Sequence, residues 1–574
     1  MKSNIIQGVC LVLLTLAGVG IALGGSGYYA QTLFTIALYI VLALGWNIIS
    51  GIAGYVSFGQ VGFFGFGAYA AALAMIHLEV DWYLAAPLAA GASALLALVL
   101  GGIMLRLNGI FFALGMFGLA RILQITASSL SITGGPMGTT VLPAESPNES
   151  ALIMVLVAAG AILIVHALSR SRLGLRLMAT RDDDLAAQSS GVNTFRAKLR
   201  ALCLRAAFGG VGGALYVWNI GYLDPNSAFN GNIELQTVLM VLAGGIGTVW
   251  GPVIGGILIS LIGTFLWARF PTEQQVILGA LTIFIAVVMP GGLTAFFEKL
   301  GWWRRQPIWS PPPAASLKPA PSPRTGAAAD EHSVALSCRG LGIRFGGVTA
   351  VDDVDLEARS GEMLAIIGPN GAGKSTLFSL MSNYLTGSGA TRFGERDIHG
   401  LKPYALAQMG LARTFQSSRL FPSLTVWETV LVAASSGRVP RQTAIHITTE
   451  LLRETGLLDH WSEQPDTLPP GLQRLLEIAR ALALRPKVLL LDEAMAGMTL
   501  HEIEQVHAAL RRAMSGGCAI VAIEHVLPAI VDLASRAQVL DFGRIIASGT
   551  PHEVLRNPEV ISAYMGADYE GGTQ

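Results

Sequence analysis

The sequence predicts a polytopic α-helical membrane domain followed by a soluble α/β domain built around a phosphate-binding loop. Three observations support this prediction. Long apolar stretches fill the first 300 residues, which hold only 13 Lys plus Arg and 11 Asp plus Glu, although the chain of 574 residues contains 38 of each class. The density of charge then rises sharply near residue 305. Further on, a strand-like apolar run at 363–367 leads directly into GPNGAGKST.

Composition also excludes some partners and sites. The formal net charge is +0, so there is no excess of basic residues to attract nucleic acid, and we expect no nucleic-acid partner. The four cysteines are too scattered to form a metal site or a disulfide framework, and we expect all of them to be packing residues. They are Cys10, Cys203, Cys338 and Cys518.

Ten apolar stretches are long enough, or nearly so, to cross about 30 Å of hydrocarbon. They lie near residues 5–24, 31–50, 52–76, 84–107, 109–130, 149–168, 202–222, 233–248, 249–268 and 275–292. Because some are short or broken by glycine, we expect about 8–10 transmembrane helices, with re-entrant segments among the remainder. The first stretch follows a weakly basic start, so we expect it to be retained as a helix rather than cleaved as a signal peptide.

The distribution of basic residues predicts the orientation, because loops rich in Lys and Arg stay in the cytoplasm. Residues 169–205 contain eight basic side chains, whereas the loops at 77–83 and 131–148 carry acids and no Lys or Arg. Four crossings after the basic loop return the chain to the cytoplasm at 302–305. Arg269, on a predicted outer loop, is the one mild exception. The soluble domain is therefore expected on the cytoplasmic side.

Composition sets the predicted domain boundaries. We assign residues 1–305 to the membrane domain, 306–332 to a linker and 333–574 to the soluble domain. The linker is rich in proline and alanine and contains Pro311-Pro312-Pro313, which is typical of a semi-extended tether.

The loop at 368–376 has the pattern GxxxxGKS between a strand and a helix, the arrangement that cradles a phosphate chain. Its glycines allow the backbone N–H groups to face inward, Lys374 would reach the β and γ phosphates, and Ser375 would place its hydroxyl on Mg²⁺. The alternative, a glycine-rich turn without a ligand, is disfavoured because a second nucleotide motif lies downstream. We expect ATP to bind through Gly368, Pro369, Asn370, Gly371, Ala372, Gly373, Lys374, Ser375 and Thr376.

That second motif is Asp492-Glu493 after four apolar residues, which places both carboxylates at the end of a buried strand. Asp492 would hold Mg²⁺ through water, and Glu493 would orient or deprotonate the attacking water. His525 follows another apolar run and would contact the γ-phosphate, although a lone histidine is more often structural. Gln416 would coordinate Mg²⁺ and report the nucleotide state to the membrane domain. Phe345 would stack on adenine, with core packing an equally good alternative.

In their order and spacing, these motifs resemble the ABC transporter ATPases, and the flanking sequence resembles the branched-chain amino acid subgroup. In the soluble half the resemblance rests on GPNGAGKSTLF, ARTFQSSRLFPSLTVWETV, QRLLEIARAL and LDFGRIIASGTPHEVL. In the membrane half it rests on ALGWNIISGIAGYVSFGQVGFFGFGAYAAAL and LMVLAGGIGTVWGPVIGG. The chain is similar to a permease and an ATPase joined head to tail, with the helical subdomain of an ABC ATPase.

The resemblance implies partners and a location. It implies a second permease, a second ATPase with an intact signature, a periplasmic solute-binding protein and membrane lipid. The bacterial inner membrane is the expected site, with the ATPase and residues 169–205 in the cytoplasm.

Two segments match the family pattern only in part. Residues 185–191 resemble the cytoplasmic loop of importer permeases that docks on the ATPase, although Leu185 replaces the usual Glu and Asp184 precedes it. The signature, normally LSGGQ or LSYGQ, is here Leu468-Pro469-Pro470-Gly471-Leu472. The hydroxyl and two backbone donors are lost, which puts the competence of this signature in doubt.

An ATP-driven importer of branched-chain amino acids or a related small solute is the main functional interpretation, with coupled ATP hydrolysis. An importer of urea or amides from the same family is an alternative. An exporter is another, because fused permease and ATPase chains are common among exporters. An ATP-regulated channel or sensor is a third, kept open by the altered signature.

Overall fold

The structure is a computed structural model that describes residues 2–270, 272–289, 291–300, 309, 311, 333–437, 439–524 and 532–565. It divides into two compact units, one of Met1–Leu177 with Phe195–Gln306 and one of Met178–Thr194 with Pro307–Gln574. The second unit therefore includes a segment from the membrane half of the sequence, which a boundary drawn along the sequence cannot capture. The predicted linker at 306–332 lies outside the described residues except for 309 and 311.

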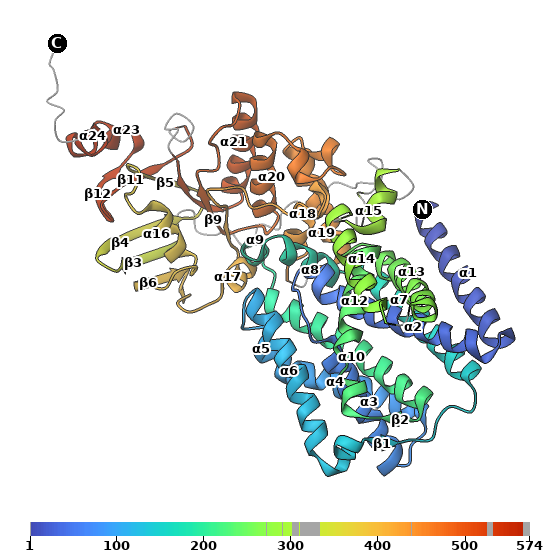
Figure 1. Cartoon of the computed structure of the whole chain (residues 1–574). Coiled ribbons are helices and arrows are strands. Elements are labelled where there is room, and N and C mark those ends of the chain that lie inside the picture. The colour runs from blue at the N-terminus through green and yellow to red at the C-terminus, as the bar shows by residue number, and fades with distance from the viewer. Residues whose placement is uncertain are drawn as a thin grey trace. The chain divides into compact units, whose positions relative to one another are not determined.

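The membrane unit consists almost entirely of helices (Figure 1). These are α1 (Lys2–Gly24), α2 (Gly27–Trp46), α3 (Gln60–His77), α4 (Trp82–Leu96), α5 (Gly102–Met104), α6 (Ile110–Ser129), α7 (Pro147–Ser169), α8 (Arg172–Asp182), α10 (Thr194–Ile220), α11 (Pro225–Ala228), α12 (Gly231–Gly244), α13 (Trp250–Arg269), α14 (Gln274–Val288) and α15 (Gly292–Lys299). Short π-helical turns lie at η1 (Asn47–Ile52) and η2 (Ala97–Gly101). Single 3-10 turns form η3 (Ser131–Thr133) and η4 (Gly135–Met137), and a two-stranded antiparallel sheet pairs β1 (Thr139–Thr140) with β2 (Tyr222–Leu223).

Within the described residues, seven helical stretches are long and apolar enough to cross a membrane. They are Gln7–Gly24, Gly27–Ile52, Gln60–His77, Trp82–Met104, Ile110–Ser129, Pro147–Ser169 and Thr194–Ile220. Two shorter apolar helical stretches follow at Trp250–Leu266 and Val276–Ile285. The polytopic fold is confirmed, but the stretch expected at 233–248 forms only the 14-residue α12. At about 1.5 Å per residue this helix is too short to span a bilayer.

Two interruptions of the membrane helices are tied together by one buried side chain. The first is η1 with the irregular residues that separate it from α3, and the second is the turn at 245–249 between α12 and α13. Asn47 in η1 donates to the carbonyl of Thr248 at 2.7 Å and accepts from the Gly247 N–H at 2.8 Å. Because lipid supplies no hydrogen bonds, this asparagine satisfies backbone groups that the broken helices leave unpaired.

Helices α3 and α10 approach closely through glycines, as the glycine-rich sequence leads one to expect. A Cβ added at Gly67 would overlap the backbone of Gly210, and one added at Gly213 would overlap the carbonyl of Phe64. By contrast, a Cβ at Gly160 on α7 would meet no heavy atom within 4 Å. Glycine is therefore required at the α3–α10 contact and not on this part of α7.

The second unit contains a six-stranded sheet in the order β12-β11-β5-β10-β9-β8 and a four-stranded antiparallel sheet in the order β4-β3-β6-β7. The strands are β3 (Val334–Phe345), β4 (Val348–Arg359), β5 (Met363–Ile367), β6 (Ser388–Phe393), β7 (Arg396–Asp397), β8 (Leu411–Arg413), β9 (Val488–Asp492), β10 (Ala519–Ile523), β11 (Arg536–Asp541) and β12 (Arg544–Gly549). In the larger sheet all neighbours are parallel except β11 and β12. Parallel strands bring their carboxyl ends to one edge, where α/β sheets bind ligands.

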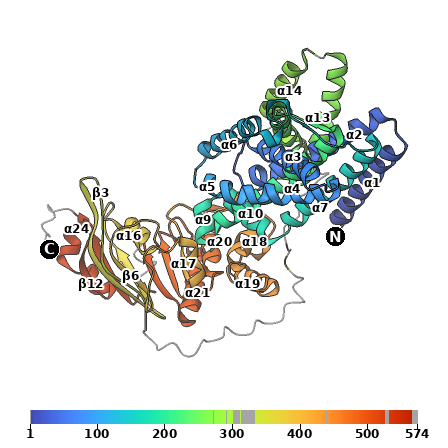
Figure 2. The same cartoon turned by 90° about the horizontal axis from the view of Figure 1, so that it is seen from below.

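Helices cover these sheets and form a separate helical subdomain. They are α9 (Asp184–Ser189), α16 (Lys374–Met381), α17 (Pro403–Met409), α18 (Val426–Ala434), α19 (Arg441–Glu454), α20 (Pro470–Leu482), α21 (Leu500–Ser515), α23 (Pro551–Leu555) and α24 (Pro558–Met565). Single turns lie at η6 (Leu458–His460) and η7 (Pro465–Thr467). Helix α18 packs on α19 and α20, which supplies the predicted helical subdomain, and α16 packs against β3, β4 and β9. Figure 2 shows α17 beside α9.

The α3–α10 contact yields a stability prediction. Gly67→Ala should destabilise the membrane unit, because over-packing a close contact costs about 1–3 kcal/mol. We expect a lower midpoint for thermal aggregation of the detergent-solubilised protein. Gly160→Ala is the matched control and should leave the midpoint unchanged. Equal midpoints for the two variants would show that α3 and α10 do not rely on this approach.

Candidate functional site

The phosphate-binding loop joins β5 to α16, as the sequence predicts. Gly368, Gly371 and Gly373 all have positive φ, at 154°, 84° and 103°. A Cβ at Gly368 would overlap the carbonyl of Leu540, and one at Gly373 would overlap that of Ala350. The loop therefore needs glycine at 368 and 373 for both backbone conformation and space, and at 371 for backbone conformation. Pro369, Asn370, Ala372, Ser375 and Thr376 lie in the same loop and in the first turn of α16.

Lys374 begins α16 and is buried. Its Nζ donates to the carbonyls of Gly368 at 2.7 Å and Pro369 at 2.8 Å. Burial lowers the pKa of this ammonium, while the nearby carboxylates of Glu493 and Asp492 raise it. The lysine side chain thus lies inside the curve of the loop, with two acidic groups close by.

Asp492 ends β9, the neighbour of β10 in the sheet, and is 1% exposed. Its Oδ2 pairs with Arg413 Nη2 at 3.3 Å, whereas its Oδ1 has no hydrogen-bond partner among the described residues. Burial raises the pKa of this carboxyl group, and Arg413 opposes that rise. A buried carboxylate oxygen left unpaired needs a cation or water, and oxygen is the ligand that Mg²⁺ prefers.

Glu493 has a φ of 49°, which is unusual for a residue with a side chain. Its N–H donates to the carbonyl of Ile523 at 2.9 Å, which holds the residue in this conformation. Gln416 Nε2 donates to Glu493 Oε2 at 3.2 Å. The structure therefore brings together four predicted residues: Lys374, Gln416, Asp492 and Glu493.

Two other predicted residues have different outcomes. His525 lies outside the described residues. Phe345 ends β3 with 49% of its side chain exposed, so its alternative role as a core residue is excluded, and contact with a base stays a prediction.

Glu524 is a buried acid beside the site that sequence reasoning missed. Its Oε1 accepts from the Met495 N–H at 2.8 Å, and its Oε2 has no partner within the described part of the chain. Burial, with a smaller contribution from the charge of Glu493, raises the pKa of Glu524 to about 7. Its position directly after the apolar run of β10 was the only available signal.

A second missed group connects α20 to the segment that carries Gln416. Glu477 Oε1 accepts from the Phe415 N–H at 3.1 Å and pairs with Arg480 Nη2 at 3.5 Å. Arg474 donates to the carbonyls of Phe415 and Gln416, and Arg480 donates to that of Arg419. Helix α20 therefore holds the backbone of 415–419 through charged side chains on its buried face.

Residues 178–194, which we call the docking segment, bind the other side of this region. Arg419 Nη1 pairs with Asp183 Oδ2 at 2.8 Å, and the Ser423 N–H donates to Asp182 Oδ2 at 2.7 Å. The segment contains α9, whose N-terminus is capped by Asp183 through the Ala186 N–H. It thus contacts the ATPase fold just beyond Gln416, which agrees with its resemblance to a loop that docks on the ATPase.

Two further contacts fix the ends of α9. Tyr384 donates through its hydroxyl to the carbonyl of Leu185 at 3.3 Å, and Gln408 Nε2 donates to that of Gly191 at 2.7 Å. Gly191 has a φ of 78°, and a Cβ added there would lie 2.9 Å from Ser436 Cβ. This glycine is required for a left-handed turn and for a close approach to Ser436.

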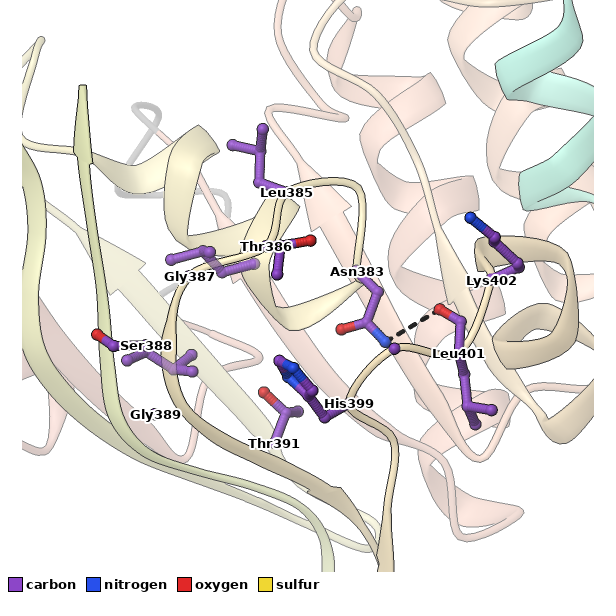
Figure 3. Close-up of a pocket in the computed structure, with 13 residues that line it drawn as sticks. Asn383, Leu385, Thr386, Gly387, Ser388, Gly389, Thr391, His399, Leu401 and Lys402 are labelled. Atoms are coloured by element: carbon purple, nitrogen blue, oxygen red, sulfur yellow. Dashed lines mark hydrogen bonds between the residues drawn. The ribbon is translucent and has the colours of Figure 1, made fainter. Parts of the chain in front are cut away.

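A cavity of about 190 Å³ lies elsewhere in this unit, between β6 and the start of α17 (Figure 3). Asn383 lines it and donates to the carbonyls of Ile398 at 2.5 Å and Leu401 at 3.1 Å. His399 and Lys402 also line it. None of the residues predicted to hold nucleotide lines this cavity, so it is separate from the candidate site.

The altered signature forms a regular helix start. Pro469 is the N-cap of α20 and Pro470 its first residue, a position that tolerates proline. The Glu502 carboxylate lies against this start, because a Cβ added at Gly471 would overlap it. Thr499 donates to Glu502 Oε2 through its N–H at 2.7 Å. An acidic side chain therefore lies at the N-terminus of α20, which is the end of a helix that attracts anions.

Three family models match the chain. Residues 28–286 match the permease component of the branched-chain amino acid transport system, 351–496 match the ABC transporter ATPase, and 544–570 match the branched-chain amino acid ATP-binding cassette transporter. Among the residues that the structure describes, no cluster of three or more His, Cys, Asp or Glu could hold a metal ion. The fold and the matches define an ABC-type ATPase joined to a polytopic permease.

Several curated relatives match the ATPase half. The high-affinity branched-chain amino acid transport ATP-binding protein LivG of Salmonella typhimurium is 38% identical over 40% of this chain and 97% of its own length. LivG of Escherichia coli is 36% identical with the same coverage, and BraF of Pseudomonas aeruginosa is 34% identical over 97% of its length. Among solved structures, a nucleotide-free ATP-binding cassette is 26% identical over 41% of this chain and 99% of its own, with a TM-score of 0.38. This chain belongs to the branched-chain amino acid family of ABC transporters, with its permease and its ATP-hydrolysing subunit fused.

The ion pair between the docking segment and the ATPase fold yields a prediction. Arg419→Glu would place a second negative charge beside Asp183. The repulsion should weaken the docking contact and lower solute-coupled ATP hydrolysis by about tenfold. Arg419→Lys should keep most of the coupling, because it retains a positive charge opposite Asp183. Basal ATP hydrolysis should change little in either case, because Arg419 is not predicted to touch nucleotide.

Arg512→Glu is the matched control for that experiment, since it reverses the charge of an exposed pair with Glu454 away from the docking segment. It should leave coupling intact. Coupling in Arg419→Glu equal to that of the wild type would show that the pair does not transmit the signal.

Proposed function

We propose that this chain imports branched-chain amino acids or a related small solute, driven by ATP hydrolysis. The observation that carries the proposal is the contact between α9 and the ATPase fold. Helix α9 comes from the permease half of the sequence, and hydrogen bonds that involve Asp183, Tyr384 and Gln408 hold it there. Such a contact can pass motion between a motor and a permease. The substrate class is supported by the relatives, whose names describe branched-chain amino acid transport.

The predicted chemistry assigns one role to each residue of the site. Lys374 would bind the β and γ phosphates, and Ser375, Gln416 and Asp492 would hold Mg²⁺, which neutralises the developing charge. Glu493 would orient or deprotonate the attacking water. The unpaired Oδ1 of Asp492 and the contact between Gln416 and Glu493 support this arrangement.

Further assignments complete the proposal. His525 would contact the γ-phosphate and Phe345 the adenine. The working assembly would include a second permease, a second ATPase with an intact signature and a periplasmic solute-binding protein. It would lie in the bacterial inner membrane, with the ATPase and residues 169–205 in the cytoplasm.

Two substitutions test the motor assignment. Lys374→Ala and Glu493→Gln should each abolish ATP-driven uptake, because one removes phosphate binding and the other removes the base that handles water. Both should leave the amount of membrane-inserted protein unchanged, since neither residue belongs to the membrane unit. Uptake in proteoliposomes measures the effect, and normal transport by either variant would refute the assignment.

We further propose that the two ATP sites of the assembly are unequal. In ABC ATPases a site combines the phosphate-binding loop of one subunit with the signature of the other, whose Ser and helix N-terminal amides bind the γ-phosphate. In this chain the signature has two prolines, which lack N–H donors, and the Glu502 carboxylate lies at the same helix end. Both features disfavour a phosphate there, although Gly471 and the remaining amides support some binding.

The inequality can be measured in the assembled complex. Restoring Ser at position 469 and Gln at 472, together with Glu502→Gln, should raise ATP turnover at the weaker site. Loss of one oxyanion-type donor costs about 10²–10³ in rate in other enzymes, so a gain of at least tenfold at that site is expected. Inactivating each subunit's catalytic Glu separately assigns the turnover. Equal losses from the two inactivations, with no gain on restoration, would contradict the inequality.

A further inference from the structure

A cavity of about 360 Å³ in the membrane unit lies where two short or interrupted helices begin. It is lined by Phe58, Val61, Phe117, Asn230, Gly231, Asn232, Glu234 and Leu235. Phe117 is near the middle of α6, which runs from Ile110 to Ser129. The remaining residues come from the starts of α3 and α12. In membrane transporters, paired helix breaks of this kind mark substrate sites near the middle of the bilayer.

Among the described residues that line this cavity, Glu234 alone has an ionisable side chain, and it is 5% exposed. Its Oε2 accepts from the Val61 N–H at 2.8 Å, at the start of α3. Its Oε1 has no hydrogen-bond partner among the described residues and lies 3.8 Å from Arg205 Nη2. An ionisable side chain buried in a membrane domain costs free energy, so a glutamate at this position indicates a function.

A group of buried polar atoms without hydrogen-bond partners surrounds that carboxylate. Arg205 Nε donates to Gln60 Oε1 at 2.6 Å, but Arg205 Nη1, Arg205 Nη2 and Gln60 Nε2 have no hydrogen bond within the described chain. Each buried polar atom without a partner calls for water or a ligand. Arg205 Nη2 lies 3.8 Å from Glu234 Oε1, so this arginine helps to hold the carboxylate in place.

The rest of the lining fits an amino acid. The start of α12 presents a positive helix end, which favours a carboxylate, and the Asn230 and Asn232 side chains carry amide donors. Phe58, Phe117 and Leu235 offer apolar surface, and these residues are 37%, 53% and 64% exposed. A cation-binding carboxylate, an anion-binding helix end and an apolar wall match an ammonium, a carboxylate and an alkyl side chain.

We propose that this cavity binds the transported solute as a zwitterion, with the ammonium on Glu234, the carboxylate at the start of α12 and the alkyl group against Phe58, Phe117 and Leu235. The proposal rests on the import function proposed above and names the solute-binding residues for it. The volume of about 360 Å³ lies within the range of small-molecule sites.

Gly231 provides the principal test. A Cβ added there would meet no heavy atom within 4 Å, so Gly231→Leu should fill the cavity without straining the protein. We expect it to lower ATP-driven uptake of L-leucine by more than tenfold in proteoliposomes that contain the full transporter and its binding protein. Gly160→Leu, also in open space on α7, is the matched control and should transport normally.

Two further variants test the charge and the apolar wall. Glu234→Gln should lower leucine uptake by about 10-fold to 100-fold, because a charged hydrogen bond to the ammonium is lost. Phe117→Trp should narrow the cavity and lower the ratio of leucine to alanine uptake by about tenfold. Since the same binding protein supplies every variant, a changed ratio reports the membrane domain and not the receptor.

The outcomes separate the two proposals. A wild-type complex that takes up no amino acid would overturn both. A wild-type complex that takes up leucine, with Gly231→Leu equally active and Phe117→Trp unchanged in its preference, would overturn this site alone. Loss of the partner permease from purified Gly231→Leu would show that the cavity is a subunit contact, which also overturns the site.

Discussion

The backbone of residues 415–419 is the constraint on which the arrangement of the ATPase unit depends. On one side Arg474, Glu477 and Arg480 of α20 bind this backbone, and on the other the Arg419 side chain pairs with Asp183 of the docking segment. Gln416, within this stretch, reaches Glu493 at the end of the sheet. A shift at any of these partners changes a buried, charged network that tolerates few alternative arrangements. These five residues therefore link the nucleotide site to helix α20 and to the docking segment.

The membrane unit is organised by a different constraint, the need to satisfy backbone polar groups where helices are interrupted. Asn47 does this for the turn between α12 and α13, and Glu234 does it for the start of α3. An asparagine can satisfy a donor and an acceptor without charge. A glutamate in the same surroundings brings a charge that Arg205 only partly offsets at 3.8 Å. Because of this difference, we assign a structural role to Asn47 and a solute-binding role to Glu234.

Helix α20 shows that a departure from a family pattern can fold normally, and we propose that it also changes the chemistry of a nucleotide site. Pro470 suits the first position of a helix because its missing N–H would be unpaired there in any case. The same missing N–H is a lost donor for a phosphate. Glu502 fits its own helix well through a capping box with Thr499, yet it brings negative charge to the start of α20. If this helix end binds phosphate as proposed, folding and nucleotide binding make opposite demands on it.

The sequence alone determined the class of both halves, the loop of 368–376, the strand that ends at Asp492 and the position of the docking segment. These features are local, since each depends on apolar periodicity or on glycine at fixed spacing along the chain. The tertiary structure alone decided the partners of Arg413, Glu477 and Arg480, the short α12, and the meeting of Gln60, Arg205 and Glu234. The longest of these contacts, between Arg205 and Gln60, joins residues 145 positions apart. Charge pairing over such separations leaves no periodic trace, because a buried ion pair depends on which helix faces come together and not on neighbouring sequence.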